Sequence, residues 1–235
     1  MRASIPAADK SLRQMNVFRD LPRESLAKVE LQCSWQTFPA RSQIIHYRDT
    51  SNDVYFIVRG TVRAELHSVH GKAVTFRDLG AGDMFGELAA IDGQRRSATI
   101  QALSNSLIAQ LPARHLWDLL ESEPAVMRAV LLHLNRLVRS LSTRVYEFSA
   151  LAVQNRIHAE LLRIARDGTA SGPEVTIARM PTHAEIASRI STHREAVARE
   201  LSRLAKLGVI TRKGAGSTIP DLDRLARMVA EATAE

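Results

Sequence analysis

Residues 86–99, GELAAIDGQRRSAT, place a carboxylate and a guanidinium nine residues apart among small side chains. Gly86 and Glu87 open the stretch, and Arg96, Ser97 and Ala98 lie near its end. A carboxylate accepts hydrogen bonds, and a guanidinium binds phosphate oxygens through paired N–H donors. Taken alone, these residues indicate a site for a sugar phosphate.

The chain around this stretch, from about residue 35 to 111, has the pattern of a β domain. DVYFIVRGTVRAELH (53–67) is rich in β-branched and aromatic residues, and TIQALSNSLIAQL (99–111) alternates apolar and polar side chains. Turn signals occur at Gly60, Gly71, Gly80, Gly82 and Asp92-Gly93. Short strands at this spacing predict a closed or double-sheet β domain, which short helices over 11–31 precede.

Past Pro112 the chain is predicted to be helical for almost 40 residues. Its apolar residues step by 4, 3, 4, 3, 4 and 3, at Met127, Leu131, Leu134, Val138, Leu141, Val145 and Phe148. Such a heptad pattern is typical of a two-stranded coiled coil, and we therefore expect a homodimer. A helix lying on its own β domain is the alternative, and Val130 and Leu137 widen the stripe enough for both packings.

The helix is expected to end or bend at about 149–155, and a second region follows. NRIHAELLRIARDG (155–168) predicts an amphipathic helix, TASGPE (169–174) a loop, and VITRKGAGSTI (209–219) a β hairpin. Between them, Ile186 lies in one short helix and Val197 in the next, separated by a turn at 190–192. This arrangement predicts a helix-turn-helix, whose second helix enters the major groove of DNA.

The chemistry of this region suits DNA. Residues 176–216 contain eight Lys or Arg and three acidic residues, and a positive excess favours phosphate contact. Arginine pairs with guanine and glutamate accepts from the cytosine amine. A helix N-cap at Thr182 aims backbone amides at a phosphate. The candidate DNA-binding residues are Thr182, His193, Arg194, Glu195, Arg199 and Lys213.

THAEIASRISTHREAVARELSRLAKLGVI (182–210) resembles the winged helix-turn-helix of the cyclic-AMP receptor protein/FNR (CRP/FNR) family of bacterial regulators. The resemblance places Arg194, Glu195 and Arg199 at the family's base-reading positions and implies a palindrome with half-sites of the TGTGA type. Ser191 departs from the family, in which many members have glycine in the turn.

FGELAAIDGQRRSAT (85–99) likewise resembles the cyclic-nucleotide cassette of that family, which lies in a jelly-roll domain. Gly86 allows a close backbone approach, Glu87 would accept the ribose 2′-hydroxyl, and a short helix through Leu88 would add positive potential from its amides. Arg96, with Ser97 and Ala98, would bind the cyclic phosphate. A structural ion pair between Glu87 and Arg96 is the alternative. Arg48 also departs from the family, in which a turn glycine is usual at this position, before Asp49.

By the same resemblance, the purine lies against the long helix, where Leu141 and Ser142 align with a polar pair of the cyclic-AMP receptor protein. Because Leu141 is apolar, cyclic AMP and cyclic GMP both remain candidates for the effector. Ser142 could reach the edge of the base; the alternative is that it is only a serine tolerated in the helix, without a role in binding.

The composition excludes several other classes. The formal charge of +7 permits an anionic partner. Cys33, the single cysteine, excludes a disulfide framework and a cysteine-built metal site, and we expect a core thiol near Trp35. The stretch 1–10 is no signal peptide and no run of 18 apolar residues exists, so we expect a cytoplasmic protein without membrane contact.

An enzyme is not expected, and neither is a metal site. The eight histidines, at 46, 67, 70, 115, 133, 158, 183 and 193, show no H-x-x-x-H or H-E-x-x-H spacing. The pair His67 and His70 is a weak metal signal by itself.

The sequence therefore predicts an α+β chain that combines a cyclic-nucleotide-binding jelly roll (1–111), a dimerisation helix with a hinge (112–150), a winged helix-turn-helix (151–222) and a tail that is a short polar helix or disordered (223–235). The expected function is cyclic-nucleotide-dependent regulation of transcription, with double-stranded DNA and RNA polymerase as partners. The alternatives are a module that gates a protein partner, and a family member that senses haem or another ligand.

Overall fold

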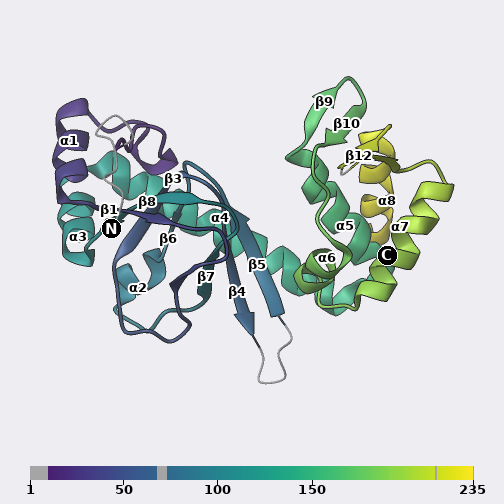
Figure 1. Cartoon of the computed structure of the whole chain (residues 1–235), viewed down its shortest axis with the longest axis horizontal. Helices are drawn as coiled ribbons and strands as arrows, with labels where there is room; N and C mark the ends of the chain where they lie inside the picture. Colours follow the sequence, from purple (N-terminus) through teal and green to yellow (C-terminus); the bar gives the residue numbers. More distant parts are fainter. Residues whose placement is uncertain (1–9, 68–72, 215, 235) are drawn as a thin grey trace. The chain divides into compact units, whose positions relative to one another are not determined.

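The computed structural model describes residues 10–67, 73–214 and 216–234, and the chain divides into two units, Met1–Arg139 and Ser140–Glu235 (Figure 1). The division falls inside a long helix, whereas the predicted domain boundaries lie at about the two ends of that helix. His70 and most of the N-terminal stretch lie outside the described residues.

The first unit contains two antiparallel sheets of four strands each. One has the order β1 (Ser34–Phe38), β8 (Ser106–Leu111), β3 (Val54–Arg59) and β6 (Met84–Phe85). The other has the order β2 (Gln43–Ile45), β7 (Thr99–Ala102), β4 (Val62–His67) and β5 (Ala73–Leu79). Their inward side chains form the core, which confirms the predicted double-sheet β domain.

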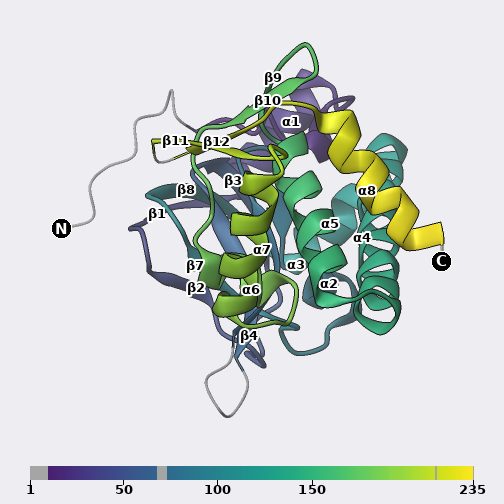
Figure 2. The same cartoon turned by 90° about the vertical axis from the view of Figure 1, so that its right-hand side faces the viewer.

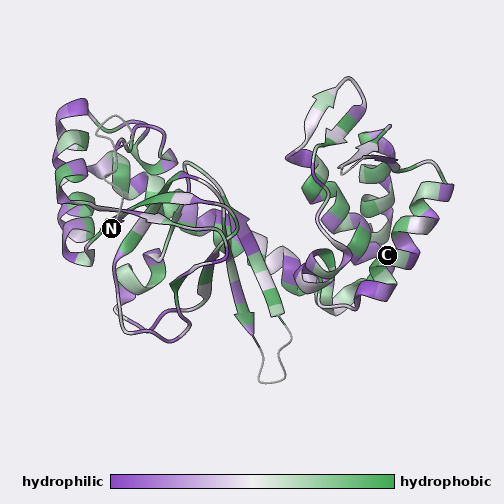
Figure 3. Cartoon of the chain, viewed as in Figure 1, coloured by the Kyte–Doolittle hydropathy of each residue, from purple (hydrophilic) through white to green (hydrophobic). Residues whose placement is uncertain are grey.

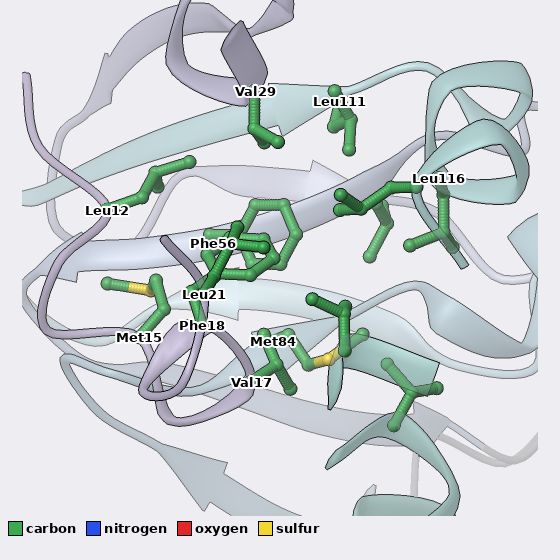
Figure 4. Close-up of a cluster of buried hydrophobic side chains, with 14 of the residues drawn as sticks. Leu12, Met15, Val17, Phe18, Leu21, Val29, Phe56, Met84, Leu111 and Leu116 are labelled. Atoms are coloured by element: carbon green, nitrogen blue, oxygen red, sulfur yellow. The ribbon is translucent and has the colours of Figure 1, made fainter. Parts of the chain in front are cut away.

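Helices pack against this β domain: η2 (Asn16–Phe18), α1 (Arg23–Gln32), α2 (Glu87–Asp92) and α3 (Ala113–Ser122). Phe56 lies at the centre of the core, 4.9 Å from the ring of Phe18, with Leu12, Met15 and Leu116 around it (Figure 4). Cys33 and Trp35 pack at the edge of this cluster, as expected. Burial raises the pKa of the Cys33 thiol to about 12, so this thiol is unreactive at neutral pH.

The long helix is α4 (Pro124–Ala150). In the first unit, Val126 and Val130 are buried in the core of the β domain, and Met127 and Leu134 are half-buried against it. Leu131 and other apolar side chains farther along the helix are exposed. The helix therefore packs on its own domain with one stripe and leaves much of its heptad stripe uncovered.

Besides the end of α4, the described part of the second unit contains four helices and a small sheet. The helices are α5 (Val153–Arg166), α6 (His183–Arg189), α7 (Arg194–Lys206) and α8 (Leu222–Ala234). The sheet has the order β11 (Thr211–Lys213), β12 (Gly216–Ile219), β10 (Glu174–Ile177) and β9 (Thr169–Ser171). Figure 2 shows α8 alongside α5, and Figure 3 shows hydrophobic and hydrophilic residues alternating along α5 and α7, as in amphipathic helices.

Two predictions in this unit need correction. Residues 169–174, predicted to be a loop, contain β9 and the start of β10, which pair as an antiparallel hairpin. The tail forms a helix, one of the two predicted alternatives, but α8 is amphipathic rather than simply polar and buries Leu225 completely against the second unit's core. The predicted break after the long helix is confirmed, since α4 ends at Ala150 and α5 begins at Val153.

A buried charge network joins the end of α4 to α5 and α6. Glu160 is only 2% exposed and pairs with Arg163 at 2.9 Å, Arg189 at 3.1 Å and Arg144 at 3.6 Å. Arg163 also binds both oxygens of Glu147, at 2.7 and 3.0 Å. The last turns of α4 are thereby fastened to the helices of the second unit.

Replacing the central carboxylate of this network is expected to destabilise the second unit strongly. Glu160→Leu would leave three guanidinium groups close together without their shared anion, at a cost of about 3–5 kcal/mol in the free energy of unfolding. Urea denaturation followed by circular dichroism measures this loss. Glu231→Leu, on the exposed side of α8, is the matched control and should change the same free energy by less than about 0.5 kcal/mol.

Candidate functional site

Gly86 begins the candidate ligand site with a backbone that requires glycine. Its φ is +80°, and α2 starts at the next residue, Glu87. A Cβ atom at Gly86 would lie 2.7 Å from a guanidinium nitrogen of Arg96 and 3.0 Å from the carbonyl oxygen of Asp53. The missing side chain therefore lets Arg96 reach the backbone at the start of α2.

Arg96 is buried, 2% exposed, and its guanidinium donates three hydrogen bonds to the protein. The acceptors are the carbonyl oxygen of Gly86 at 3.0 Å, that of Asp53 at 2.8 Å and Ser51 Oγ at 3.1 Å. The same group lies over the ring of Tyr55, 5.5 Å from its centroid. An arginine has five N–H donors, so these bonds to described residues leave two for an anion.

Glu87 is buried as well, 3% exposed, in the first turn of α2. Its Oε1 lies 3.3 Å from Nε2 of His133 on α4 and 3.5 Å from Nη2 of Arg77 on β5. Burial opposes ionisation, but the hydrogen bond from His133 and the charge of Arg77 outweigh it and lower the pKa of the Glu87 carboxyl. The carboxylate therefore stays ionised and able to accept a ligand hydroxyl.

The structure gives Glu87 and Arg96 separate partners. Glu87 contacts His133 and Arg77, whereas Arg96 binds backbone carbonyls and Ser51, and no ion pair joins the two among the described residues. This arrangement disfavours the alternative of a structural ion pair between them.

Ser97, Ala98 and Leu88 complete the predicted cassette. Ser97 is exposed, Ala98 is half-buried and Leu88 is 39% exposed. Within the described residues, the amides of Ser97 and Ala98 have no hydrogen-bond acceptor. Two unpaired amides directly after a buried guanidinium fit an anionic group such as a phosphate.

Sequence reasoning missed five residues that this site uses: Ser51, Asp53, Tyr55, Arg77 and His133. Four of them come from strands or a loop outside the cassette and gave no local signal. His133 did leave one, because it is the polar member of the helical stripe Val126, Val130, His133, Leu137, whose two valines are buried in the core of the β domain.

In the second unit, the structure builds the predicted helix-turn-helix from α6 and α7. Thr182 caps α6: its hydroxyl accepts from the amide of Glu185, whose side chain in turn accepts from the amide of Thr182. Ser191 in the turn has φ +51°, the left-handed conformation that glycine adopts without cost. The turn that the family builds with glycine is thus made here by serine.

The predicted base-reading residues lie at the exposed start of α7. Arg194 and Glu195 have side-chain exposures of 77% and 59% and pair with each other at 2.8 Å. Arg199 follows on α7 and is exposed, and His193 is the exposed residue before the helix. Arg194 and Glu195 border a shallow hollow that Thr182 also lines. Lys213 is exposed on β11, at the edge of the small sheet.

The heptad stripe on α4 is largely uncovered. Val138 is 62% exposed, Val145 64% and Leu131 58%, and Leu141 and Phe148 are also exposed. Leu141 and Ser142 belong to the second unit, with α6 and α7, whereas Glu87 and Arg96 belong to the first. A contact between Ser142 and a purine base therefore stays a prediction.

The part of the chain that the structure describes contains no group of three or more His, Cys, Asp or Glu arranged to hold a metal ion. None of its helices combines the length and the apolar character needed to cross a membrane.

Two family models match the chain. One, described as "Cyclic nucleotide-binding domain", matches residues 35–123, which include Gly86, Glu87 and Arg96. The other, described as "Crp-like helix-turn-helix domain", matches residues 155–228, which include α6, α7 and the β11–β12 hairpin. Each match therefore falls on one of the two candidate sites.

Similar proteins support both matches. The "cAMP-activated global transcriptional regulator CRP" of Haemophilus influenzae is 27% identical over 187 residues, which cover 77% of this chain and 82% of that protein. The "CRP-like cAMP-activated global transcriptional regulator" of Mycobacterium tuberculosis is 24% identical over 220 residues, which cover 93% of this chain and 98% of that protein. The structure of a CooA mutant from Carboxydothermus hydrogenoformans has the same fold, with a TM-score of 0.78 at 20% identity over 92% of this chain and 95% of that one.

Proposed function

Because this chain belongs to the CRP/FNR family of transcription regulators, we propose that it is a homodimeric DNA-binding regulator whose effector is a 3′,5′-cyclic nucleotide. The observation that carries the proposal is the pair of buried charges around α2, Glu87 and Arg96, each held by its own partners. Desolvated charges of opposite sign on one short segment suit a ligand that carries both hydroxyl and phosphate groups.

The ligand would be held by its ribose phosphate. The remaining N–H donors of Arg96 and the amides of Ser97 and Ala98 would bind the cyclic phosphate, with the hydroxyl of Ser97 as a further donor. Glu87 would accept the ribose 2′-hydroxyl, which a 3′,5′-cyclic phosphate leaves free. Leu88 would contribute its amide at the start of α2, where the amides carry partial positive charge.

Cyclic AMP is the first candidate effector, because the two curated relatives are named as cAMP-activated regulators. Cyclic GMP stays the second, since Leu141 stands where a polar partner for the base was expected and only Ser142 can donate or accept there. Isothermal titration calorimetry with each nucleotide decides between them.

The proposed dimer would use the uncovered stripe of α4, from Met127 to Phe148. Exposed apolar residues that repeat with heptad spacing are the signature of a helix that pairs with a second copy. Met127 and Leu134 contact the chain's own domain at the same time, so the helix can carry both packings.

On DNA, the two copies of α7 would enter successive major grooves about 34 Å apart, and each would read one TGTGA-type half-site. The exposed Arg194, Glu195 and Arg199 would contact base edges. Thr182 at the start of α6, His193 and Lys213 would contact phosphates. The bound dimer would then regulate transcription by recruiting RNA polymerase to the promoter that contains its site, or by blocking RNA polymerase there.

Removing one base-reading arginine is expected to weaken specific binding. Arg199→Ala should cost about 1–3 kcal/mol at a palindromic TGTGA duplex, because a bidentate contact to guanine is lost. Fluorescence anisotropy against that duplex and a scrambled one measures the difference. Arg227→Ala, an exposed arginine on α8, is the control. An equal loss on both duplexes would assign Arg199 to phosphate contact.

Ligand control would follow from a difference in affinity between two arrangements of the dimer. A ligand shifts such an equilibrium only as far as it binds one state better than the other. Glu87 and Arg96 belong to the first unit and α7 to the second, so the nucleotide would change the affinity for DNA only if it bound the DNA-competent arrangement better.

A further inference from the structure

His133 stands out as a polar residue in an apolar stripe. On α4, Val126, Val130 and Leu137 occupy the same stripe one or two turns away, and the two valines are buried in the core of the first unit. The His133 side chain is itself only 14% exposed. A histidine at this position loses hydration, so it needs a polar partner.

That partner is the carboxylate of Glu87. Nε2 of His133 lies 3.3 Å from Oε1, and Nη2 of Arg77 lies 3.5 Å from the same oxygen. Neither contact uses Oε2. The hydrogen bond from His133 and the charge of Arg77 act on the same oxygen, so they restrain the carboxylate and leave Oε2 as the acceptor for a ligand.

The two partners of Glu87 differ in kind. Arg77 is 31% exposed and comes from β5, while His133 is more buried and comes from the long helix. Solvent screens the arginine contact more than the histidine contact, so His133 supplies the more directional restraint. The restraint also ties α2 to α4, two elements of the first unit that are 46 residues apart at this contact.

We propose that His133 is a positioning residue for ribose recognition: by holding Oε1 of Glu87 it presents Oε2 to the ligand's 2′-hydroxyl. The inference rests on the proposed function and deepens it, because it names the group through which the site would distinguish a ribonucleotide from a 2′-deoxyribonucleotide. His133 acts through Glu87 and makes no ligand contact of its own.

The test compares cyclic AMP with its 2′-deoxy analogue by isothermal titration calorimetry. His133→Leu is expected to weaken cyclic AMP binding about tenfold, the usual scale for losing a hydrogen bond to a charged group. Binding of the 2′-deoxy analogue should change less than about twofold, because that ligand makes no demand on Glu87. His133→Gln, which keeps an N–H donor, should restore most of the affinity for cyclic AMP.

Two controls separate positioning from packing. Arg136→Leu also adds an apolar side chain to α4, at an exposed position, and should leave both affinities unchanged. In a Glu87→Gln background, His133→Leu should have less than about a twofold further effect on cyclic AMP binding, since both changes act on the same contact.

Equal losses for the two ligands in His133→Leu, or no loss for either, would overturn the assignment of His133. If the unsubstituted chain bound neither cyclic AMP nor cyclic GMP, the proposed function itself would fall, and the inference with it. Thermal melting of each variant shows whether a loss of affinity arises from unfolding. If His133→Leu unfolds, the affinities of His133→Gln for cyclic AMP and for its 2′-deoxy analogue decide whether His133 positions Glu87.

Discussion

An Arg96→Leu variant is expected to lose cyclic-nucleotide binding, with a dissociation constant raised by about a hundredfold or more. The change removes the buried cation that would pair with the phosphate, and hydrogen bonds to charged groups contribute about 1.5–3 kcal/mol each. Calorimetry with cyclic AMP and cyclic GMP measures the loss. Undiminished binding by this variant would show that the cassette is assigned wrongly.

The same substitution has a structural cost that needs its own control. The carbonyl oxygens of Gly86 and Asp53 and the hydroxyl of Ser51 lose their donor when Arg96 is replaced, so the first unit should also lose stability. Arg96→Lys keeps the charge without the forked geometry and is expected to retain weak binding. Circular dichroism then separates lost ligand contact from lost fold.

A Val138→Lys variant is expected to be monomeric and to lose specific DNA binding. In the proposed dimer each Val138 faces the stripe of the partner helix, and two ammonium groups would be desolvated there at several kcal/mol each. The dimer dissociation constant should rise about a thousandfold, because about 4 kcal/mol corresponds to that factor. Sedimentation velocity over a concentration series measures the shift.

Arg136→Glu, a larger change of charge at an exposed position on another face of α4, is the matched control and should stay dimeric. A dimer that survived Val138→Lys unchanged would mean that the exposed stripe is not the interface.

Local patterns were enough to predict the main elements, because the signals lie within each element. The alternation in 99–111, the heptad steps of the long helix and the cap at Thr182 are all readable over a few residues. The hairpin at 169–177 and the apolar packing of the tail helix escaped, since β9 is three exposed residues long and α8 is fixed by packing of Leu225. Pairing and packing, more than propensity, decide such segments.

Of the candidate ligand site, only the residues of the cassette 85–99 could be predicted from the sequence. Glu87 and Arg96 are close in sequence, but Arg77 and His133 reach Glu87 from a strand and from the long helix, and spacing carries no record of such long-range contacts. The two departures from family glycines, Arg48 and Ser191, both keep the left-handed backbone, with φ of +68° and +51°. At both positions the fold requires a left-handed backbone, which is strained for a residue that has a side chain.

The central claim, that a cyclic nucleotide controls DNA binding, is tested most directly by the affinity for a palindromic TGTGA duplex with and without nucleotide. Fluorescence anisotropy at fixed salt should show binding tightened about 5- to 150-fold by saturating cyclic AMP or cyclic GMP, the usual range of allosteric coupling. The same affinity in the absence and presence of both nucleotides would contradict the account.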